Sequence, residues 1–487
     1  MSEELLSVVE RSRISARDSI SNQKKKLEEQ YFTPERIARK MASFFTVNRK
    51  KSLAVLDPCA GVGNLAAAIY ERGIDNQETQ KILLIERDSY LYDICTGNFR
   101  DIKNARIVNA DFFDISANLG TFDRIILNPP YAKLNSGSLL SAQVQKKLGY
   151  AEPNLYSAFI SFCLSMLSAE GELVAIIPRS FCNGPTFKKF RKNLCEFFSF
   201  QEFYLFESRK IFSDSKVLQE LIIIKISRKQ SSHVKISHES TAGNMVEFYA
   251  SRHEIVFPHD DSKVIHVPLA IGDKLLLSAI SRFKNTLLKT GLRASTGKVV
   301  DFRCRELLSY RKSPNRTNLL YQEDVAFSKL VQFSKHGNKP RFIAITNESQ
   351  GILIRRNNYI LVRRISFKES ATKIVASPLL EEQFSEAVIG VDNHLNYIWG
   401  ESADITTGTC LALTAYLSSK TIDLYFRRFS GHTQINAADL NSLPVPDAKT
   451  LEVFYNTHKS MTLREMIEVA DFYFFETCDH GIDTPVS

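Results

Sequence analysis

The sequence lacks the features that mark secreted, zinc-stabilised or membrane-spanning proteins. Its eight cysteines form no CxxC pair, which argues against a zinc ribbon or a disulfide framework and favours a reducing cytosol. No apolar run reaches bilayer length, and the charged N-terminal segment has no signal-peptide centre. No His, Cys and Asp cluster has the spacing of metal ligands. We therefore expect a cytoplasmic protein with no membrane partner and no metal.

The charge of the chain is concentrated in one stretch. Of 487 residues, 63 are Lys or Arg and 54 are Asp or Glu, which gives a net charge of +9. The window 293–370 holds 16 basic and 6 acidic residues, a net +10, so the rest of the chain carries −1. Such a patch predicts a polyanionic partner, although a solvated basic face without a ligand would give the same composition.

The first half of the chain alternates apolar strands with helices. After a helical lead-in (1–30), we predict helices over 65–73, closed by Gly73, and over 154–168. Predicted strands span 52–58, 81–88, 105–113, 122–131, 171–178 and 218–227. Continuous apolar strands alternating with helices indicate an α/β fold with a parallel sheet covered on both faces. The polar, Ser-rich stretch 227–244 marks a boundary, which predicts two domains, 1–240 and 241–487.

A glycine turn follows the first predicted strand, in Asp57-Pro-Cys-Ala-Gly61-Val-Gly63. Glycines there let the backbone turn sharply and approach a ligand, and no Gly-Lys-Ser/Thr follows to make a phosphate loop. Glu86 ends the next strand, where an acid can accept hydrogen bonds from ribose hydroxyls. Asp111 and Phe112 offer an acceptor beside an aromatic ring, which suits adenine. Each feature alone has a structural explanation, but together they predict a nucleotide-type ligand at the carboxyl edge of the sheet.

Asn128-Pro129-Pro130-Tyr131 follows the fourth strand. The two prolines remove two backbone donors and fix φ twice, so the Asn128 side chain and the Pro129 carbonyl are held as a rigid pair of acceptors. Tyr131 adds an aromatic face. This arrangement suits a planar amino group that is gripped by acceptors while its ring is stacked, whereas the alternative is a rigid turn after a buried strand.

These motifs resemble a known family. DPCAGVG followed by NPPY is similar to the S-adenosylmethionine-dependent amino-methyltransferases, and Tyr31-Phe-Thr33-Pro34 resembles the corresponding segment of γ-type DNA adenine-N6 methyltransferases such as the TaqI methylase. STGKVVDFR (295–303), VDNHLNYIWG (391–400) and SGHTQINAADLNSLPVP (430–446) resemble the target-recognition half of the BsuBI/PstI modification methylases. The resemblance implies a Rossmann-like catalytic domain with a mostly parallel seven-stranded sheet, and a C-terminal α+β target-recognition domain.

The resemblance also implies residue roles. The substrate would be an adenine flipped out of double-stranded DNA, gripped at its N6 amino group by Asn128 and Pro129 and stacked between Tyr131 and Phe187. Pro130 completes the catalytic segment. S-adenosyl-L-methionine would contact Tyr31, Thr33, Asp57, Pro58, Ala60, Gly61, Gly63, Glu86, Arg87, Asp111, Phe112 and Asn128. DNA would contact Arg303, Arg311, Lys312, Arg355, Arg356, Arg363 and Arg364, and Arg305 belongs to the same basic window.

Other functions remain open at this point. Protein-glutamine and ribosomal-RNA amino-methyltransferases have a segment similar to NPPY. Cytosine-N4 DNA methylases usually carry Ser in place of Asn128. A fused restriction–modification enzyme would need an added nuclease domain. A non-catalytic DNA-binding module would be expected to lose Asn128 or the glycine turn. The PstI and BsuBI methylases act on CTGCAG, which is a first guess for the target. We expect a monomer that is paired functionally with a cognate restriction endonuclease, without a stable complex.

Overall fold

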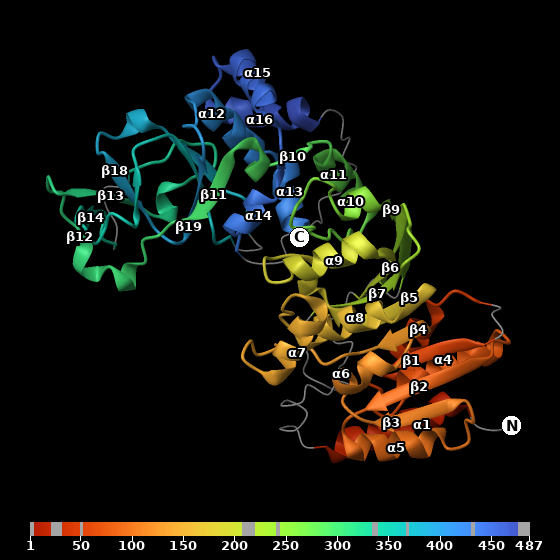
Figure 1. The fold of residues 1–487 in the computed structure, drawn as a ribbon. Coiled ribbons are helices and arrows are strands. Elements are labelled where there is room, and N and C mark those ends of the chain that lie inside the picture. Colours follow the sequence, from red (N-terminus) through yellow and green to blue (C-terminus); the bar gives the residue numbers. More distant parts are fainter. Residues whose placement is uncertain are drawn as a thin grey trace. The chain divides into compact units, whose positions relative to one another are not determined.

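The computed structural model describes residues 4–20, 32–48, 52–206, 220–239, 244–333, 339–366, 370–429 and 434–475. The chain forms two compact units (Figure 1). The first unit contains Met1–Ile255 and Lys263–Leu269, and the second contains Val256–Ser262 and Ala270–Ser487. The predicted division at 240/241 falls between two paired strands of the first unit, so the compact unit extends further, to Ile255.

One nine-stranded sheet forms the centre of the first unit, in the order β3-β2-β1-β4-β5-β7-β6-β8-β9. The first five of these strands in spatial order run parallel to one another, and β7 lies antiparallel to both β5 and β6. The α/β fold with a mostly parallel sheet is therefore confirmed, and β8 and β9 lengthen the expected seven-stranded sheet at one edge. The strands are β1 Leu53–Asp57, β2 Gln80–Glu86, β3 Ala105–Asn109, β4 Phe122–Leu127, β5 Leu167–Pro178, β6 Ser199–Phe206, β7 Leu221–Ser227, β8 His233–Glu239 and β9 Met245–Ser251.

Helices of the first unit pack on this sheet and on one another. α1 packs against α4 and α5, and α8 packs against β5 (Figure 1). α3 packs against α4. Buried apolar residues such as Leu6, Ile37 and Ile69 form the contact faces of these helices. The helices are α1 Leu5–Ser19, α3 Glu35–Ser43, α4 Asn64–Asp75, α5 Ser89–Phe99, α6 Phe112–Ile115, α7 Leu139–Leu148, α8 Leu155–Ser165, α9 Lys188–Phe197 and α10 Arg252–Ile255, with 3-10 turns η1 Ser116–Asn118 and η2 Arg179–Cys182.

Two sequence expectations were wrong. Gly73 does not close its helix, because α4 continues to Asp75; the glycine instead makes room for Gln80, whose side chain would lie 2.1 Å from an added Cβ. The Ser-rich stretch 227–244 was expected to mark the domain boundary, but it contains β8, which pairs with β6 in the sheet of the first unit. β8 has only intermittent apolar residues, and this weak pattern concealed the strand.

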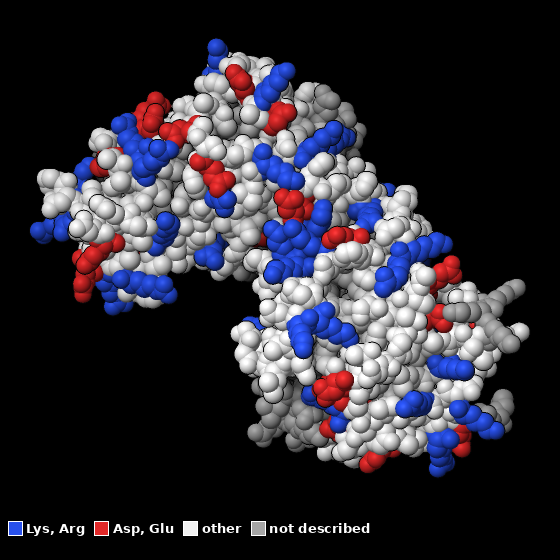
Figure 2. Space-filling view, in the orientation of Figure 1, with Lys and Arg blue, Asp and Glu red and all other residues white. Residues whose placement is uncertain are grey.

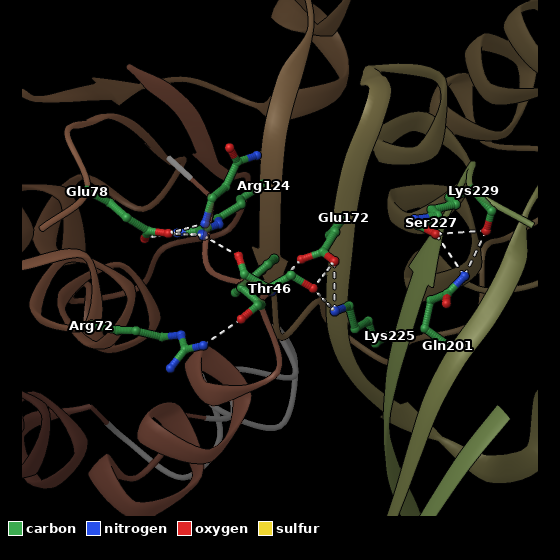
Figure 3. A network of polar contacts seen from close by, with 11 residues as sticks. Thr46, Arg72, Glu78, Arg124, Glu172, Gln201, Lys225, Ser227 and Lys229 are labelled. Carbon is green, nitrogen blue, oxygen red and sulfur yellow. Dashed lines mark hydrogen bonds and ion pairs between the residues drawn. The ribbon is translucent and has the colours of Figure 1, made fainter. Parts of the chain in front are cut away.

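A polar network ties the segment after α3 to the sheet (Figure 3). Arg124 of β4 donates to Glu78 at 2.6 Å and 2.7 Å and to the carbonyl of Thr46 at 2.7 Å. Glu172 of β5 accepts hydrogen bonds from the N–H and hydroxyl of Thr46 and forms an ion pair with Lys225 of β7. Arg124 and Glu172 lie in the amino-terminal part of the parallel register, away from the carboxyl edge.

The second unit contains two larger sheets and a group of helices. A four-stranded sheet, β11-β19-β16-β17, alternates its side chains between two cores. Ile360 and Val362 of β16 pack in the helical core, whereas Tyr359 and Leu361 pack in the core shared with a five-stranded sheet, β12-β14-β13-β18-β15. This α+β architecture agrees with the expected class of the C-terminal half.

The strands of the second unit are β10 Asn285–Thr286, β11 Leu292–Thr296, β12 Leu308–Ser309, β13 Arg316–Leu320, β14 Phe342–Ala344, β15 Leu353–Arg355, β16 Tyr359–Arg363, β17 Ala376–Leu379, β18 Val388–Val391, β19 Leu395–Gly400 and β20 Pro444–Val445. Its helices are α11 Ile271–Ser281, α12 Thr407–Leu417, α13 Lys420–Phe429, α14 Ala437–Asn441, α15 Ala448–His458 and α16 Leu463–Phe475. Its 3-10 turns are η3 Leu287–Thr290, η4 Asp301–Arg303, η5 Arg305–Leu307, η6 Gln322–Asp324 and η7 Glu381–Gln383. Within the described part of the chain, every helix is too short or too polar to span a bilayer.

Candidate active site

The turn between β1 and α4 places its two glycines in different roles. Gly61 has φ +56° and lines a cleft at the carboxyl edge of the sheet, where an added Cβ would only touch Phe32 at 3.9 Å. Gly63 has φ +100° and packs against α5, because an added Cβ would lie 2.4 Å from the ring of Phe99. Gly61 is therefore the glycine that lets the backbone approach a ligand, and Gly63 lets the helices pack.

Glu86 is held rigidly at the end of β2. Its Oε2 accepts the Gly61 N–H at 2.8 Å, and its Oε1 accepts the Asp88 N–H at 2.8 Å. Burial raises the pKa of this carboxyl, against the two hydrogen bonds that lower it. Each carboxylate oxygen has further lone pairs, so the group can also accept a pair of ligand hydroxyls.

Asp57 lies behind the turn and is fully buried. Its Oδ1 accepts the Cys59 N–H at 3.3 Å, while Oδ2 is buried with no hydrogen-bond partner among the described residues. Burial raises the pKa of Asp57 to about 8, the Cys59 hydrogen bond opposes this shift, and the nearby Glu86 charge adds to it. An unsatisfied buried carboxylate oxygen is costly, and protonation of Asp57 relieves that cost.

The cleft has apolar walls with a few polar groups, which is typical of a small-molecule site. Seven of the predicted cofactor residues line it: Pro58, Gly61, Glu86, Arg87, Asp111, Phe112 and Asn128. The lining set does not include Thr33, Asp57, Ala60 or Gly63, and Tyr31 lies outside the described residues. Pro130, predicted only as part of the catalytic segment, also lines the cleft. The remaining wall residues were not predicted from the sequence: Phe32, Cys59, Ile85, Leu91, Ala110, Phe113, Leu140, Leu155 and Phe159.

Asp111 and Phe112 serve the fold at the same time as they face the cleft. Asp111 caps α6, because its Oδ1 accepts the Phe113 N–H at 2.9 Å, and Arg87 lies 4.0 Å from its other oxygen. The Phe112 ring stacks on Phe159 with centroids 5.2 Å apart and planes at 12°. An aromatic wall next to a carboxylate is an arrangement that can hold an adenine ring.

Asn128 is oriented by two neighbours. Its Nδ2 donates to the Thr33 hydroxyl at 3.0 Å, and its Oδ1 accepts the Tyr131 hydroxyl at 2.8 Å. Its backbone oxygen accepts a weak hydrogen bond from the Cys59 thiol at 3.5 Å. Thr33 therefore reaches the site through Asn128 and not as part of the cleft wall, and the amide of Asn128 has a defined direction.

The two residues predicted to stack on a base belong to one aromatic cluster. Tyr131 meets Tyr156 edge to face at 6.4 Å, and Tyr156 stacks on Phe187 at 5.5 Å. Tyr131 is 4% exposed and Phe187 is 7% exposed. Tyr156, which the sequence reasoning missed, joins the two rings, and a stacking role for either ring requires it to turn toward an incoming base.

The predicted DNA-binding cations differ in their surroundings. Four of them have partners within the second unit: Arg355 pairs with Asp404, Arg356 donates to the Glu381 carbonyl, Arg363 to the Val325 carbonyl, and Arg364 to the Asn393 carbonyl. Lys312 pairs with Glu386 at 3.0 Å. By contrast, Arg303, Arg305 and Arg311 are exposed and have no carboxylate at ion-pair distance among the described residues. Figure 2 shows that basic and acidic side chains alternate over much of the drawn face, so charge sign alone does not define one continuous stripe.

The strand order of the first unit, with an antiparallel β7 inserted between β5 and β6, is the fold of the S-adenosylmethionine-dependent methyltransferases. The cleft fits that cofactor, because Gly61 leaves room for it, Glu86 offers paired acceptors, and Phe112 offers an aromatic wall.

Comparison with known proteins defines the class further. A family model described as Eco57I restriction-modification methylase matches residues 19–212. The type II methyltransferase M.BsuBI of Bacillus subtilis is 33% identical over 470 residues, which are 92% of this chain and 93% of that protein. M.PstI of Providencia stuartii is 31% identical over 426 residues, covering 82% and 84%. The solved structure of the type IIL enzyme MmeI in complex with DNA covers 99% of this chain and 75% of that chain, at 13% identity and a TM-score of 0.49. The chain belongs to the type II restriction–modification methyltransferases, which modify DNA with S-adenosylmethionine.

Proposed function

We propose that the protein transfers a methyl group to the N6 amino group of an adenine in double-stranded DNA, within a specific sequence. The observation that supports this most directly is the placement of Asn128. It lines the cofactor cleft, and its amide is oriented by Thr33 and Tyr131. Bound S-adenosylmethionine supplies an electrophilic methyl group on a sulfonium. The target amino group must therefore meet an acceptor beside this cleft, and Asn128 is such an acceptor.

The chain's own groups would raise the reactivity of the amine by electrostatics. An N6 lone pair is delocalised into the purine ring, so its nitrogen must pyramidalise and gain positive charge as it reacts. The amide oxygen of Asn128, together with the Pro129 carbonyl, would stabilise that charge without reorganisation at the moment of transfer. Asn does not act as a base at neutral pH, so the surplus proton would pass to water.

The adenine of a duplex cannot reach this edge of the sheet, so the target base would have to flip out of the helix. Tyr131 and Phe187 would stack on it, and this contact requires both rings to turn out of the cluster they form with Tyr156. Stacking on aromatic side chains would then offset part of the few kcal/mol that unstacking costs.

The two units would divide the work. The first, with the cleft, would bind cofactor and target base, and the second would read the DNA sequence, with Arg303, Arg311, Lys312, Arg355, Arg356, Arg363 and Arg364 as the predicted contacts. The partners already made by the last four arginines favour roles within the fold for part of their donors. We further propose a monomer that protects DNA from a cognate restriction endonuclease.

Incubation of DNA with methyl-labelled S-adenosylmethionine, followed by nucleoside analysis, tests the proposal. N6-methyladenine is the expected product, whereas N4-methylcytosine, or label in RNA or protein alone, would overturn it. The Asn128→Ala variant should lose at least about 10²–10³-fold in rate, the usual cost of removing one such group, while cofactor binding persists. Asn118→Ala, an exposed asparagine on η1, is the matched control and should keep full activity. Long-read sequencing of methylated DNA would then give the target sequence and test CTGCAG.

A further inference from the structure

A short segment of the second unit exposes aromatic rings and arginines together. Residues 302–311, here named the aromatic–basic turn, run from η4 through η5 into β12 and the bend after it. Phe302 is 66% exposed and Tyr310 is 65% exposed. The turn thus exposes two aromatic rings together with several exposed arginines, and this combination, not the exposure of a single ring, indicates an interaction surface.

The turn is well anchored beneath these rings. Leu307 and Leu308 pack against a small core that includes Tyr321 and Ile343, and Leu308 pairs with Ile343 in the sheet. The Tyr321 hydroxyl donates to Asp301 at 3.3 Å, directly before Phe302. The exposed ring is therefore presented by a supported backbone and is not the result of a loosely attached end.

Three guanidinium groups accompany the rings. Arg303, Arg305 and Arg311 are exposed, and within the described part of the chain their guanidinium groups make no ion pair and no side-chain hydrogen bond; Arg303 instead lies over the Phe302 ring at 5.5 Å. In Figure 2, blue side chains lie beside red ones on the drawn face where Figure 1 shows the segment that leads into β12. The sequence of the turn contains a single acidic residue, Glu306.

We propose that the aromatic–basic turn is a DNA contact in which Phe302 stacks on a nucleobase that becomes exposed when the duplex is unstacked, while Arg303, Arg305 and Arg311 contact phosphates. Charge complementarity selects nucleic acid as the partner, because a cluster of arginines with little acidic compensation suits phosphates and would weaken self-association through like-charge repulsion. An exposed ring flanked by cations is the arrangement that binds bases at distorted or opened steps. The inference rests on the proposed function, in which flipping opens such a step.

A second exposed ring in the same unit provides the matched control. Phe472 on α16 is 76% exposed, but it follows Asp471 and lies one turn after Glu468. Phe472 is therefore an exposed ring like Phe302, but its charged neighbours on the helix are acidic instead of basic. A generic effect of removing an exposed ring would appear at both positions, whereas a DNA contact would appear only at Phe302.

The test compares Phe302→Ala, Phe302→Trp and Phe472→Ala in the full-length protein, with linear plasmid DNA as the probe. Phe302→Ala should weaken DNA binding and raise the KM for DNA by about 5- to 150-fold, which corresponds to the loss of one stacked base. Phe302→Trp should restore binding, Phe472→Ala should match the wild type, and all three should bind S-adenosylmethionine normally. Arg303→Ala and Arg311→Ala should each reduce the salt slope of DNA binding by about 0.9.

Fluorescence reports stacking directly. The chain has a single tryptophan, Trp399, so in a Trp399→Phe background the Phe302→Trp variant carries its only indole within the aromatic–basic turn. Quenching of that indole by plasmid DNA, without quenching in a Phe472→Trp variant of the same background, would support the proposal. Unchanged DNA affinity in Phe302→Ala, equal loss in Phe472→Ala, or a change in oligomeric state instead of DNA affinity would each overturn it. Failure of the proposed function has a different signature, since the wild type would then transfer no methyl group to adenine.

Discussion

Each oxygen of the Glu86 carboxylate accepts one backbone N–H, so this residue fixes the shape of the glycine turn before any cofactor binds. The same two oxygens are the acceptors proposed for ribose hydroxyls. A side chain that performs both tasks needs no reorganisation on binding, which lowers the entropic cost of association. At the residue scale, therefore, the cofactor site is preorganised by hydrogen bonds within the turn.

Replacement of Glu86 should weaken cofactor binding without changing DNA binding. Loss of hydrogen bonds to a buried carboxylate costs about 1.5–3 kcal/mol, or roughly 10- to 150-fold in the Kd for S-adenosylmethionine. Calorimetric titration of Glu86→Ala measures this change. Glu170→Ala removes an exposed carboxylate from the same unit and should leave the Kd unchanged. Equal affinity in both variants would remove Glu86 from the site.

Asp57 gives a prediction about pH. Burial raises its pKa in the fold to about 8, far above that of an unfolded aspartate, so the folded state holds a proton that the unfolded state has lost. By linkage, the free energy of unfolding of the cofactor-free protein should fall as the pH rises toward 8. Asp57→Asn cannot ionise, so its stability should depend less on pH over that interval. Denaturant unfolding between pH 6 and about 8 measures both slopes, and parallel curves would contradict the assignment.

At the scale of elements, the segment between α3 and β1 links two parts of the first unit. Thr46, which follows α3, accepts a hydrogen bond from Arg124 of β4 and donates one to Glu172 of β5 (Figure 3). Thr33, which precedes α3, accepts a hydrogen bond from Asn128. The helix is therefore fixed at one end by a polar network and bonded at the other to the site. This connection explains how residues before the sheet come to orient Asn128 at the cleft.

Arg124→Ala should destabilise the first unit markedly. The variant leaves the carboxylate of Glu78 buried without its partner, which typically costs about 3–5 kcal/mol. Arg100→Ala breaks an exposed pair with Asp101 and should cost at most about 1 kcal/mol. Chemical denaturation of both variants checks the difference. Similar losses in the two would show that the buried pair contributes no more than a surface one.

Acid should weaken the same network. Burial opposes ionisation of Glu78, but the hydrogen bonds from Arg124 and Asn48 outweigh it and lower the pKa of the carboxyl. A lowered carboxyl pKa contributes stability that is present above the unfolded pKa and is lost as the pH falls through the folded value. This dependence is opposite in direction to that of Asp57, so the two groups favour stability at intermediate pH.

The sequence predicted β1, β2 and β4 well, because each contains a continuous run of mostly buried apolar residues. It missed β6 and β8, whose partly exposed positions interrupt the pattern. Of the site, the short motifs at Asp57, Glu86 and Asn128 were visible as strand ends. The walls contributed by Leu140, Leu155 and Phe159 were not, because apolar helix residues look alike whether they face a core or a cleft.

At the scale of the whole molecule, each compact unit has its own apolar core, and the cofactor cleft belongs to the first unit alone. A ligand that binds one folded unit stabilises that unit by RT ln(1 + [L]/Kd), which is about 2.7 kcal/mol at a concentration of 100 Kd. The second unit gains nothing directly from such binding. The cofactor can therefore be used to separate the stabilities of the two units.

Differential scanning calorimetry should then resolve two unfolding transitions. S-adenosylmethionine should raise the midpoint temperature of only one of them. Asn118→Ala should show the same shift as the wild type, whereas Glu86→Ala should lose most of it, because the ligand then has a higher Kd. Arg124→Ala should lower the ligand-sensitive transition and leave the other in place, which assigns that transition to the first unit. A single transition that shifts as a whole with cofactor would mean that the units unfold cooperatively, and would contradict the division of binding and stability proposed for them.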